Sequence, residues 1–326
     1  MSARARTTLV LVALICPVFA HASTETAQGW YKRMQEALAT RSYEGIVVYM
    51  GDGQPGSYRL VVCADGYARL TALSGSAREI IRGPQVAVRM RPDGSSIVVH
   101  GLAGESSPLP FPPASKVDPA RLVNYRLDLA GWDRVAGQMA RVIMFTPRDQ
   151  WRYGYRVWIA EKSGLPLRSE LIADDGQVLE QAFFTQIKML TAAAARSGIG
   201  AKTLELVSGK EQGASHESDG ACPDERAGTL SVNGLPPGFR ILQTVCEHAT
   251  GARGPVTHFL VGDGLATISV FVAPYQHVGS VLIGGTTLGA VHAVGRVAGG
   301  FAVTAMGDAP SITISQIARA VAVAGH

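Results

Sequence analysis

The sequence predicts an α+β fold: a large, curved, antiparallel β-sheet that wraps over helices, followed by a smaller C-terminal α+β domain. The first observation is a change of apolar period, from about 3.6 residues near the N-terminus to about two over most of the following chain. The second is a series of short turns rich in Asp and Gly. Such turns favour antiparallel neighbours, because a parallel crossover needs about a dozen residues or more. The third is the length of 326 residues, which favours two domains over one.

The composition excludes several classes of protein. Hydrophobic residues make up 47% of the chain and charged residues 17%, so wholesale disorder is excluded. Lys+Arg number 30 and Asp+Glu 26, a formal net charge of +4, and this weak, scattered excess argues against a nucleic-acid binder. The four cysteines, Cys16, Cys63, Cys222 and Cys246, form no C-x-x-C pair. We therefore expect no zinc or iron–sulfur site.

Residues 1–22 have the pattern of a secretory signal. Arg4 and Arg6 supply the positive start, residues 8–19 form a mostly apolar run, and Ala20-His21-Ala22 has the small residues of a cleavage site. The apolar run is shorter than the ~20 residues that a membrane-spanning helix needs. The sequence therefore predicts cleavage after Ala22 and a soluble mature protein outside the cytoplasm.

An oxidising compartment leaves the remaining cysteines two alternatives. Cys222 and Cys246 lie in the same C-terminal region and are the candidate disulfide. In the alternative all three cysteines are unpaired thiols, and Cys63, which falls in a strand pattern, is a small buried apolar residue.

The elements of the first domain follow from the two periods. Residues 26–40 carry Trp30, Met34 and Leu38 at helical spacing, with Ala37 on the same side. The period then changes to about two, and the predicted strands are residues 45–50, 57–63, 68–73, 86–91, 97–100, 122–129, 139–145, 151–160, 165–172 and 178–187.

Two segments interrupt this rhythm. Residues 106–119 contain five prolines and predict a long loop. Residues 191–228 are rich in Ala, Gly and Ser and predict a linker. The domains are therefore a signal peptide over 1–22, a large sheet domain over 23–190, a linker over 191–228 and a small α+β domain over 229–326.

The small domain is expected to have its own core. Pro310 precedes an apolar stretch at 312–323 and suits the start of a terminal helix. The predicted strands of this domain are residues 239–247, 258–261, 267–273, 290–297 and 301–305.

The motifs that carry catalysis or cofactor binding do not appear in a suitable context. The run from Gly51 to Gly56 matches G-x-G-x-x-G, but a strand pattern follows it where a dinucleotide site needs a helix. A hairpin turn explains it better. No two histidines are four residues apart in a helical pattern, and no nucleophile has a recognisable base. We expect no enzyme, no metal and no cofactor.

Three strand segments are apolar at odd and even positions alike: residues 46–50, 142–145 and 157–159. Strands exposed on one face alternate, so these strands are expected to be covered on both. Two explanations remain open. The sheet either curls around a hydrophobic cavity that accepts apolar ligands, or it has an ordinary core with the second domain docked on it.

Residues 146–167 are the densest part of the chain in Arg, Tyr and Trp. In an extended strand Tyr153 and Tyr155 share one face, and Arg152, Arg156 and Trp158 share the other. Such residues are enriched at protein interfaces. Cross-strand pairs with a cation–π contact explain them equally well.

Short motifs occur along nearly the whole mature chain. They are YEG at 43–45, AREIIR at 77–82, RVAG at 134–137, PRD at 147–149, RYGYRVW at 152–158, SGLPL at 163–167, VLEQ at 178–181, LPPGF at 235–239 and DGLATISVF at 263–271. No single motif is specific, but through their combination and order the chain resembles the RseB/MucB family of periplasmic sigma-E regulatory proteins.

The resemblance implies an N-terminal half-barrel similar to lipoprotein carriers and a smaller C-terminal domain. It implies a protein that binds the periplasmic part of a single-span anti-sigma factor, shields it from regulated proteolysis and responds to lipid or lipopolysaccharide. A homodimer is compatible with this function. The alternatives are a lipid or lipoprotein carrier without a signalling partner, and a hydrolase with an unrecognised site.

The residues that we expect to bind the partner or a lipid are arginines and aromatic residues. Arginine suits the phosphate groups of a lipid head, and aromatic residues anchor protein interfaces. The candidates are Arg78, Arg82, Arg152, Tyr153, Tyr155, Arg156, Trp158 and Phe271.

Overall fold

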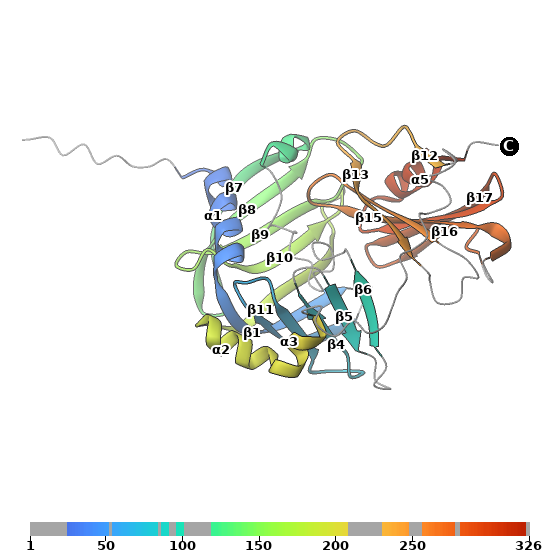
Figure 1. Ribbon diagram of the computed structural model, residues 1–326. Coiled ribbons are helices and arrows are strands. Elements are labelled where there is room, and N and C mark those ends of the chain that lie inside the picture. The colour runs from blue at the N-terminus through green and yellow to red at the C-terminus, as the bar shows by residue number, and fades with distance from the viewer. Residues whose placement is uncertain are drawn as a thin grey trace, which may run out of the picture.

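Two β-sheets of unequal size form the framework (Figure 1). This computed structural model describes residues 25–51, 54–83, 86–90, 96–100, 119–207, 230–247, 256–277 and 281–323. The predicted signal over 1–22, the proline-rich part of the 106–119 loop and Cys222 lie outside these residues. In the described part of the chain no helix is long and apolar enough to cross a bilayer.

The N-terminal helix, α1 (Ala27–Thr40), forms where the apolar spacing predicts it. Trp30, Met34 and Ala37 are buried on one side of the helix, together with Tyr31. Thr26 is the N-cap, because its hydroxyl accepts a hydrogen bond from the Gly29 N–H at 3.0 Å. The cap satisfies one of the N–H groups that have no partner within the helix.

Replacement of Thr26 by Ala should remove this cap. We expect the free energy of unfolding to fall by about 1 kcal/mol, measured by urea denaturation. Thr40→Ala is the matched control at the other end of α1, where the hydroxyl donates to the Glu36 carbonyl. That variant should change stability by less than about 0.5 kcal/mol. Equal losses in the two variants would contradict the capping role.

The large sheet has eleven strands, and every neighbouring pair is antiparallel. The strand order is β6-β5-β4-β3-β2-β1-β11-β10-β9-β8-β7. In Figure 1 the sheet curls from β7 through β11 and β1 to β6, so the predicted curved antiparallel sheet is confirmed. The strands are β1 (Ser42–Gly51), β2 (Gln54–Val62), β3 (Ala68–Ala72), β4 (Glu79–Arg82), β5 (Val86–Met90), β6 (Ser96–His100), β7 (Tyr125–Val135), β8 (Gln138–Pro147), β9 (Gly154–Ala160), β10 (Pro166–Ile172) and β11 (Val178–Leu190).

The first hairpin shows that the G-x-G-x-x-G match belongs to a turn between two strands. β1 and β2 pair directly across the turn, with Gly51 opposite Gln54. A strand therefore follows the motif, as the hairpin explanation predicts, and no helix N-terminus is present there to hold a pyrophosphate.

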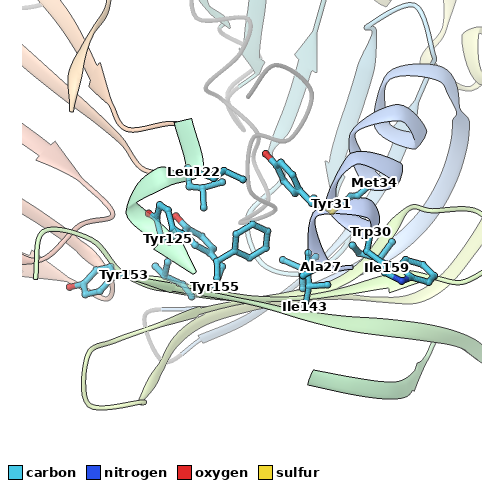
Figure 2. Close-up of a cluster of buried hydrophobic side chains, with 14 of the residues drawn as sticks. Ala27, Trp30, Tyr31, Met34, Leu122, Tyr125, Ile143, Tyr153, Tyr155 and Ile159 are labelled. Carbon is cyan, nitrogen blue, oxygen red and sulfur yellow. The ribbon is translucent and has the colours of Figure 1, made fainter. Parts of the chain in front are cut away.

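Side chains from both faces of the large sheet are buried. On one face α1 packs against β8 and β9 in a cluster that includes Ile143 and Ile159 (Figure 2). On the opposite face of the same two strands Val142 and Trp158 form a second cluster. The expectation that the apolar runs are covered on both sides is confirmed for residues 142–145 and 157–159. It is wrong for residues 46–50, where Val47 is buried but Met50 is 41% exposed.

Two helices in the segment that the sequence assigns to a linker cover part of the second face. α2 (Ala192–Ile199) and α3 (Ala201–Val207) follow β11. Ala195 and Ile199 of α2 pack on Val61 of β2 and on Cys63, which directly follows that strand. Val207 of α3 packs on the neighbouring strands β4 and β5. The first part of the predicted 191–228 linker is therefore helical and packs on the first domain.

The C-terminal domain is built on a six-stranded antiparallel sheet of order β13-β14-β15-β18-β17-β16. α5 covers one face and forms a core with Ile268, Val270 and Val303 of the sheet. β12 and β19 form a separate two-stranded sheet. The elements are β12 (Leu230–Val232), β13 (Arg240–Glu247), β14 (Val256–Gly262), β15 (Thr267–Pro274), β16 (Gly284–Leu288), β17 (Val291–Ala298), β18 (Phe301–Gly307), α5 (Ser311–Ala320) and β19 (Val321–Val323).

The predicted terminal helix is too long. Helix α5 ends at Ala320, and the three residues of β19 follow it as a strand. Val321 is buried in the core either way. The apolar pattern was therefore right about burial and wrong about the element, because β12 supplies a strand partner that local sequence does not reveal.

Candidate functional site

The two domains meet at a buried junction formed by the turn before β9. In the N-terminal domain, η1 (Pro119–Asn124) and the start of β7 lie beside this turn. The C-terminal domain contributes the turns around Pro237, Asp263 and Ala290. Three of the predicted candidates, Arg152, Tyr153 and Tyr155, lie here.

Arg152 is the centre of the junction, and its side chain is fully buried. Its Nε donates to Asp149 Oδ1 at 2.9 Å within its own domain. Its terminal nitrogens donate across the junction to Asp263 Oδ2 and to the Pro237 carbonyl. Burial alone would lower the pKa of the guanidinium, but the two carboxylates outweigh it and raise that pKa above its ordinary value.

Two aromatic rings enclose the Arg152 guanidinium. Its Cζ lies 5.6 Å from the ring centroid of Tyr125 and 5.1 Å from that of Phe239, within cation–π range. The Tyr125 hydroxyl also donates to Asp263 Oδ2 at 3.1 Å. Burial and the nearby Asp263 charge raise the pKa of Tyr125 well above its ordinary value, so this phenol remains a donor.

Asp263 is held by its own domain as well. Its Oδ1 accepts from the N–H groups of Leu265 and Ala266 at 3.0 and 2.8 Å. One carboxylate oxygen therefore shapes the turn after β14, and the other oxygen binds the N-terminal domain. A buried ion pair offsets its desolvation cost when the remaining acceptors of its carboxylate are also hydrogen-bonded, as they are here.

A second polar contact crosses the junction beside the first. The Tyr153 hydroxyl lies 3.0 Å from His292 Nε2, and Thr287 Oγ1 lies 3.0 Å from His292 Nδ1. Burial, and then the carboxylates of Asp174 and Asp308, raise the pKa of Tyr153. Burial lowers the pKa of His292.

Apolar packing also joins the domains. Leu265 and Ala290 of the C-terminal domain belong to the same buried cluster as Tyr125 and Tyr155. In the other direction, Trp151 packs against the core of the C-terminal domain. The Thr313 hydroxyl of α5 donates to the Trp151 carbonyl at 2.7 Å. The second domain therefore docks on the end of the large sheet.

The predicted face of Arg152 is wrong. The sequence places it on the side of Arg156 and Trp158, but β9 begins only at Gly154 and Arg152 lies in the preceding turn. The alternation of side chains along a strand does not apply in a turn, and the Arg152 side chain points toward Tyr125. Because its donors bind Asp149, Asp263 and Pro237, Arg152 does not offer them to a lipid phosphate.

Arg156 and Trp158 lie on the other face of β9, where they form cross-strand pairs. Trp158 donates from Nε1 to Asp133 at 2.8 Å, and Arg168 stacks over its ring at 4.5 Å from the centroid. Arg156 and Arg168 both bind the buried carboxylate of Glu170. The structural explanation for these two residues is therefore confirmed, and they are separated from the junction by the sheet.

The remaining candidates lie elsewhere. Arg78 is exposed in the loop before β4. Arg82 is half-buried at the end of β4, and burial lowers the pKa of its guanidinium while Tyr43 opposes the shift. Phe271 of β15 stacks on His258, with ring centroids 4.3 Å apart. These three do not converge on one site.

Of the two alternatives for the cysteines, the described residues agree with the one that has a disulfide in the C-terminal region. Cys246, in β13, is disulfide-bonded. Cys63 is a buried free cysteine beneath α2. The pairing of Cys246 with Cys222 remains a prediction, because Cys222 is outside the described residues.

Metal binding finds no support in the described ranges of the chain. There, no three His, Cys, Asp or Glu side chains are grouped so that they could hold a metal ion. The junction offers hydrogen bonds, rings and a buried ion pair. Such groups position two domains or recognise a polypeptide.

Two family profiles match consecutive parts of the chain. The profile of the MucB/RseB N-terminal domain matches residues 26–202, and that of the MucB/RseB C-terminal domain matches residues 224–322. The chain belongs to the MucB/RseB family.

Named relatives align along almost the whole MucB/RseB chain. The sigma factor AlgU regulatory protein MucB of Pseudomonas aeruginosa is 32% identical over 328 residues, which cover 97% of each protein. The sigma-E factor regulatory protein RseB of Haemophilus influenzae is 26% identical over 323 residues, with 96% of each covered.

A solved structure of the Pseudomonas aeruginosa MucA/MucB complex contains a chain of the same fold. It superposes with a TM-score of 0.64 at 27% identity, covering 92% of this chain and 99% of that one. A structure of MucB in complex with MucA(peri) superposes with a TM-score of 0.63, also at 27% identity. Sequence and structure thus agree on the MucB/RseB assignment.

Sequence reasoning missed the partners of Arg152 and Tyr153. Asp263 precedes a glycine, and this pair of residues predicts only a turn. Tyr125 falls in a strand pattern, which predicts the side of the sheet that it faces but not the residue that it contacts. His292 is isolated in the sequence. Nothing local in this MucB/RseB chain predicts that residues more than a hundred positions apart bind one another.

The lowered pKa of His292 predicts a pH-dependent stability. The neutral ring is favoured in the folded state, so its contribution is present above the unfolded pKa of about 6.5 and is lost as the pH falls through the folded pKa. We expect wild type to lose more stability than His292→Asn between about pH 7 and about pH 5. Urea denaturation at a series of pH values measures this. Parallel curves for the two proteins would contradict it.

Proposed function

We propose that this protein is a periplasmic negative regulator of the sigma-E envelope stress response. It binds the periplasmic part of a single-span anti-sigma factor and shields that factor from regulated proteolysis. The observation that carries the proposal is the match of both domains, in order, to the MucB/RseB family. The relatives named as sigma factor regulatory proteins, and the structures of MucB bound to MucA, support it.

The protein acts by binding and not by catalysis in this proposal. Its two sheets are joined by the Arg152–Asp263 pair and by apolar packing, so they present their surfaces in a fixed relation to one another. A fixed arrangement lowers the entropic cost of recognising a partner that contacts both domains.

A binding titration tests the proposal. The purified mature protein is titrated with the periplasmic part of a single-span anti-sigma factor from the same organism, and association is followed by calorimetry. We expect a complex at micromolar concentration or tighter. No complex between the two folded proteins at that concentration would overturn the proposed function.

The family resemblance also supports a response to lipid or lipopolysaccharide. An amphiphile shifts the balance between bound and released protein only by its differential affinity for the two states. A tenfold preference for the released form moves that balance by about 1.4 kcal/mol. Lipopolysaccharide added to the preformed complex should then weaken the anti-sigma interaction, and an unchanged affinity would remove the lipid response from the proposal. A carrier would instead transfer lipid to an acceptor membrane without needing the C-terminal domain.

A further inference from the structure

Within the described part of the chain, the C-terminal sheet ends in a strand that has no strand partner on its outer edge. β16 occupies the last position of the six-stranded sheet and pairs with β17 on its inner side. All five of its residues are exposed. In an antiparallel pair every other residue directs its N–H and C=O away from its partner strand. The outer edge of β16 therefore presents backbone donors and acceptors to an incoming chain.

Two other edge strands with described side chains, β7 and β13, are protected against strand addition, and the edge strands β12 and β19 are only three residues long. β7 carries Arg126 and Asp128 and has a register shift between Leu129 and Trp132. β13 begins with Arg240 and has a register shift directly after Ile241. Charges and bulges of this kind are the usual means of blocking edge-to-edge pairing.

β16 lacks each of these protections. Its sequence is Gly-Gly-Thr-Thr-Leu, without a charge or a proline, and its pairs with β17 run in one unbroken register. Large apolar side chains lie at its two ends. Ile283 is 72% exposed and Leu288 is 66% exposed. An edge with free backbone groups between two exposed apolar side chains suits an extended polypeptide.

The domain junction holds this edge in place. Thr287 of β16 contacts His292, which contacts Tyr153 of the N-terminal domain. The turn between β16 and β17 places Ala290 in the buried cluster of the N-terminal domain. Because one end of the β16–β17 hairpin is fixed, the edge is already formed before a partner binds. Binding therefore costs little conformational entropy on this side of the interface.

We propose that the outer edge of β16 is a strand-addition site for an extended segment of the partner polypeptide. Backbone hydrogen bonds to β16 supply the affinity, and apolar side chains of the segment pack beside Ile283 and Leu288. The identification of this partner with the anti-sigma factor rests on the proposed function. The inference adds the conformation of the bound segment and the strand that receives it.

A second copy of this chain is the less suitable occupant. Five residues at ~3.3 Å each give an edge of only ~16 Å, and stable protein interfaces bury about 1,200 Å² or more. Two globular copies that met along this edge alone would fall short of that area. An extended segment is free to continue from the edge over neighbouring surfaces.

The first test places a charge on the edge. Thr286 is exposed, so Thr286→Lys should leave the fold intact while blocking strand addition. Overlapping peptides from the periplasmic part of a single-span anti-sigma factor from the same organism serve as probes. We expect at least tenfold weaker binding for Thr286→Lys. The matched control is Thr244→Lys, the same change at an exposed position on the protected edge strand β13, and it should bind as wild type does.

The second test observes the backbone directly. Amide hydrogen exchange of the full mature chain is compared with and without the tightest-binding peptide. We expect slower exchange at alternate residues of β16 and unchanged exchange in β13. A complex that forms equally well with Thr286→Lys and leaves β16 exchange unchanged would overturn the strand-addition site while leaving the proposed function standing. Failure of wild type to bind any probe would overturn both. Loss of self-association in Thr286→Lys, with peptide binding unchanged, would assign the edge to a second copy and overturn the proposal.

Discussion

Replacement of Arg152 by Met should lower the free energy of unfolding by about 3–5 kcal/mol, as expected when one member of a buried ion pair is removed. The Asp263 carboxylate is fully buried in the junction, and without the guanidinium its charge has lost its principal compensation. The Pro237 carbonyl loses a donor at the same time. Urea denaturation of the full mature chain measures the loss.

Two further variants show that the loss comes from the buried charge. Arg152→Met combined with Asp263→Asn removes both charges and retains an oxygen that accepts from Leu265 and Ala266, so the double variant should be more stable than the single one. Arg126→Ala breaks an exposed pair with Asp128 and should cost about 1 kcal/mol or less. A loss below about 1 kcal/mol in Arg152→Met would contradict the central role of this pair.

Replacement of Phe145 by Ala should cost about 3–5 kcal/mol through loss of burial and the cavity that remains. Phe145 is fully buried in the cluster between α1 and the large sheet. Its ring meets that of Tyr31 edge-on, with centroids 5.5 Å apart, so the variant also loses an aromatic contact between helix and sheet. Thermal and urea unfolding both report this loss.

An exposed apolar residue of the same domain provides the control for this variant. Val123 is 70% exposed, and Val123→Ala should change stability by less than about 0.5 kcal/mol. If Phe145→Ala and Val123→Ala were equally stable, α1 would not depend on this cluster for its attachment to the sheet.

The residues that pack locally were predictable because their period gives both the element and its buried face. Trp30, Met34 and Ala37 define the buried side of α1, and the structure buries each of them. β4 and β16 escaped prediction for the opposite reason. β4 has four residues, too few to show an alternation, and β16 is entirely exposed, so it has no apolar face to detect.

Helices α2 and α3 show how composition misleads at a domain boundary. The alanine run after Thr191 suggested a linker, although alanine is the strongest helix former and threonine a good N-cap. The Thr191 hydroxyl accepts from the Ala194 N–H at 3.2 Å. Helices this short are marginal in isolation. Their burial against β2, β4 and β5 stabilises them, and that contact is absent from the local sequence.

In the candidate site, too, local pattern predicted some side-chain positions and tertiary contacts decided the others. Tyr153 and Tyr155 lie on the predicted side, in one buried cluster with Val157, although Tyr153 directly precedes β9. Arg152 was assigned to the wrong face because β9 begins two residues after it, and turn geometry decides where its side chain points. Its partners Tyr125, Phe239 and Asp263 come from segments brought together only when the domains dock.

The sequence by itself determined the antiparallel sheet, the faces of its apolar strands, the two-domain order and the family, because each is written in local periods, turn residues and short motifs. Only the tertiary structure decided which arginine is buried between the domains, which helices cover the second face of the sheet, and which edge strand stays open. These outcomes depend on contacts between residues far apart in the chain. Local pattern determines the face of the strand or helix on which a side chain lies. The residue that it contacts there depends on how the large sheet curves and how the two domains dock.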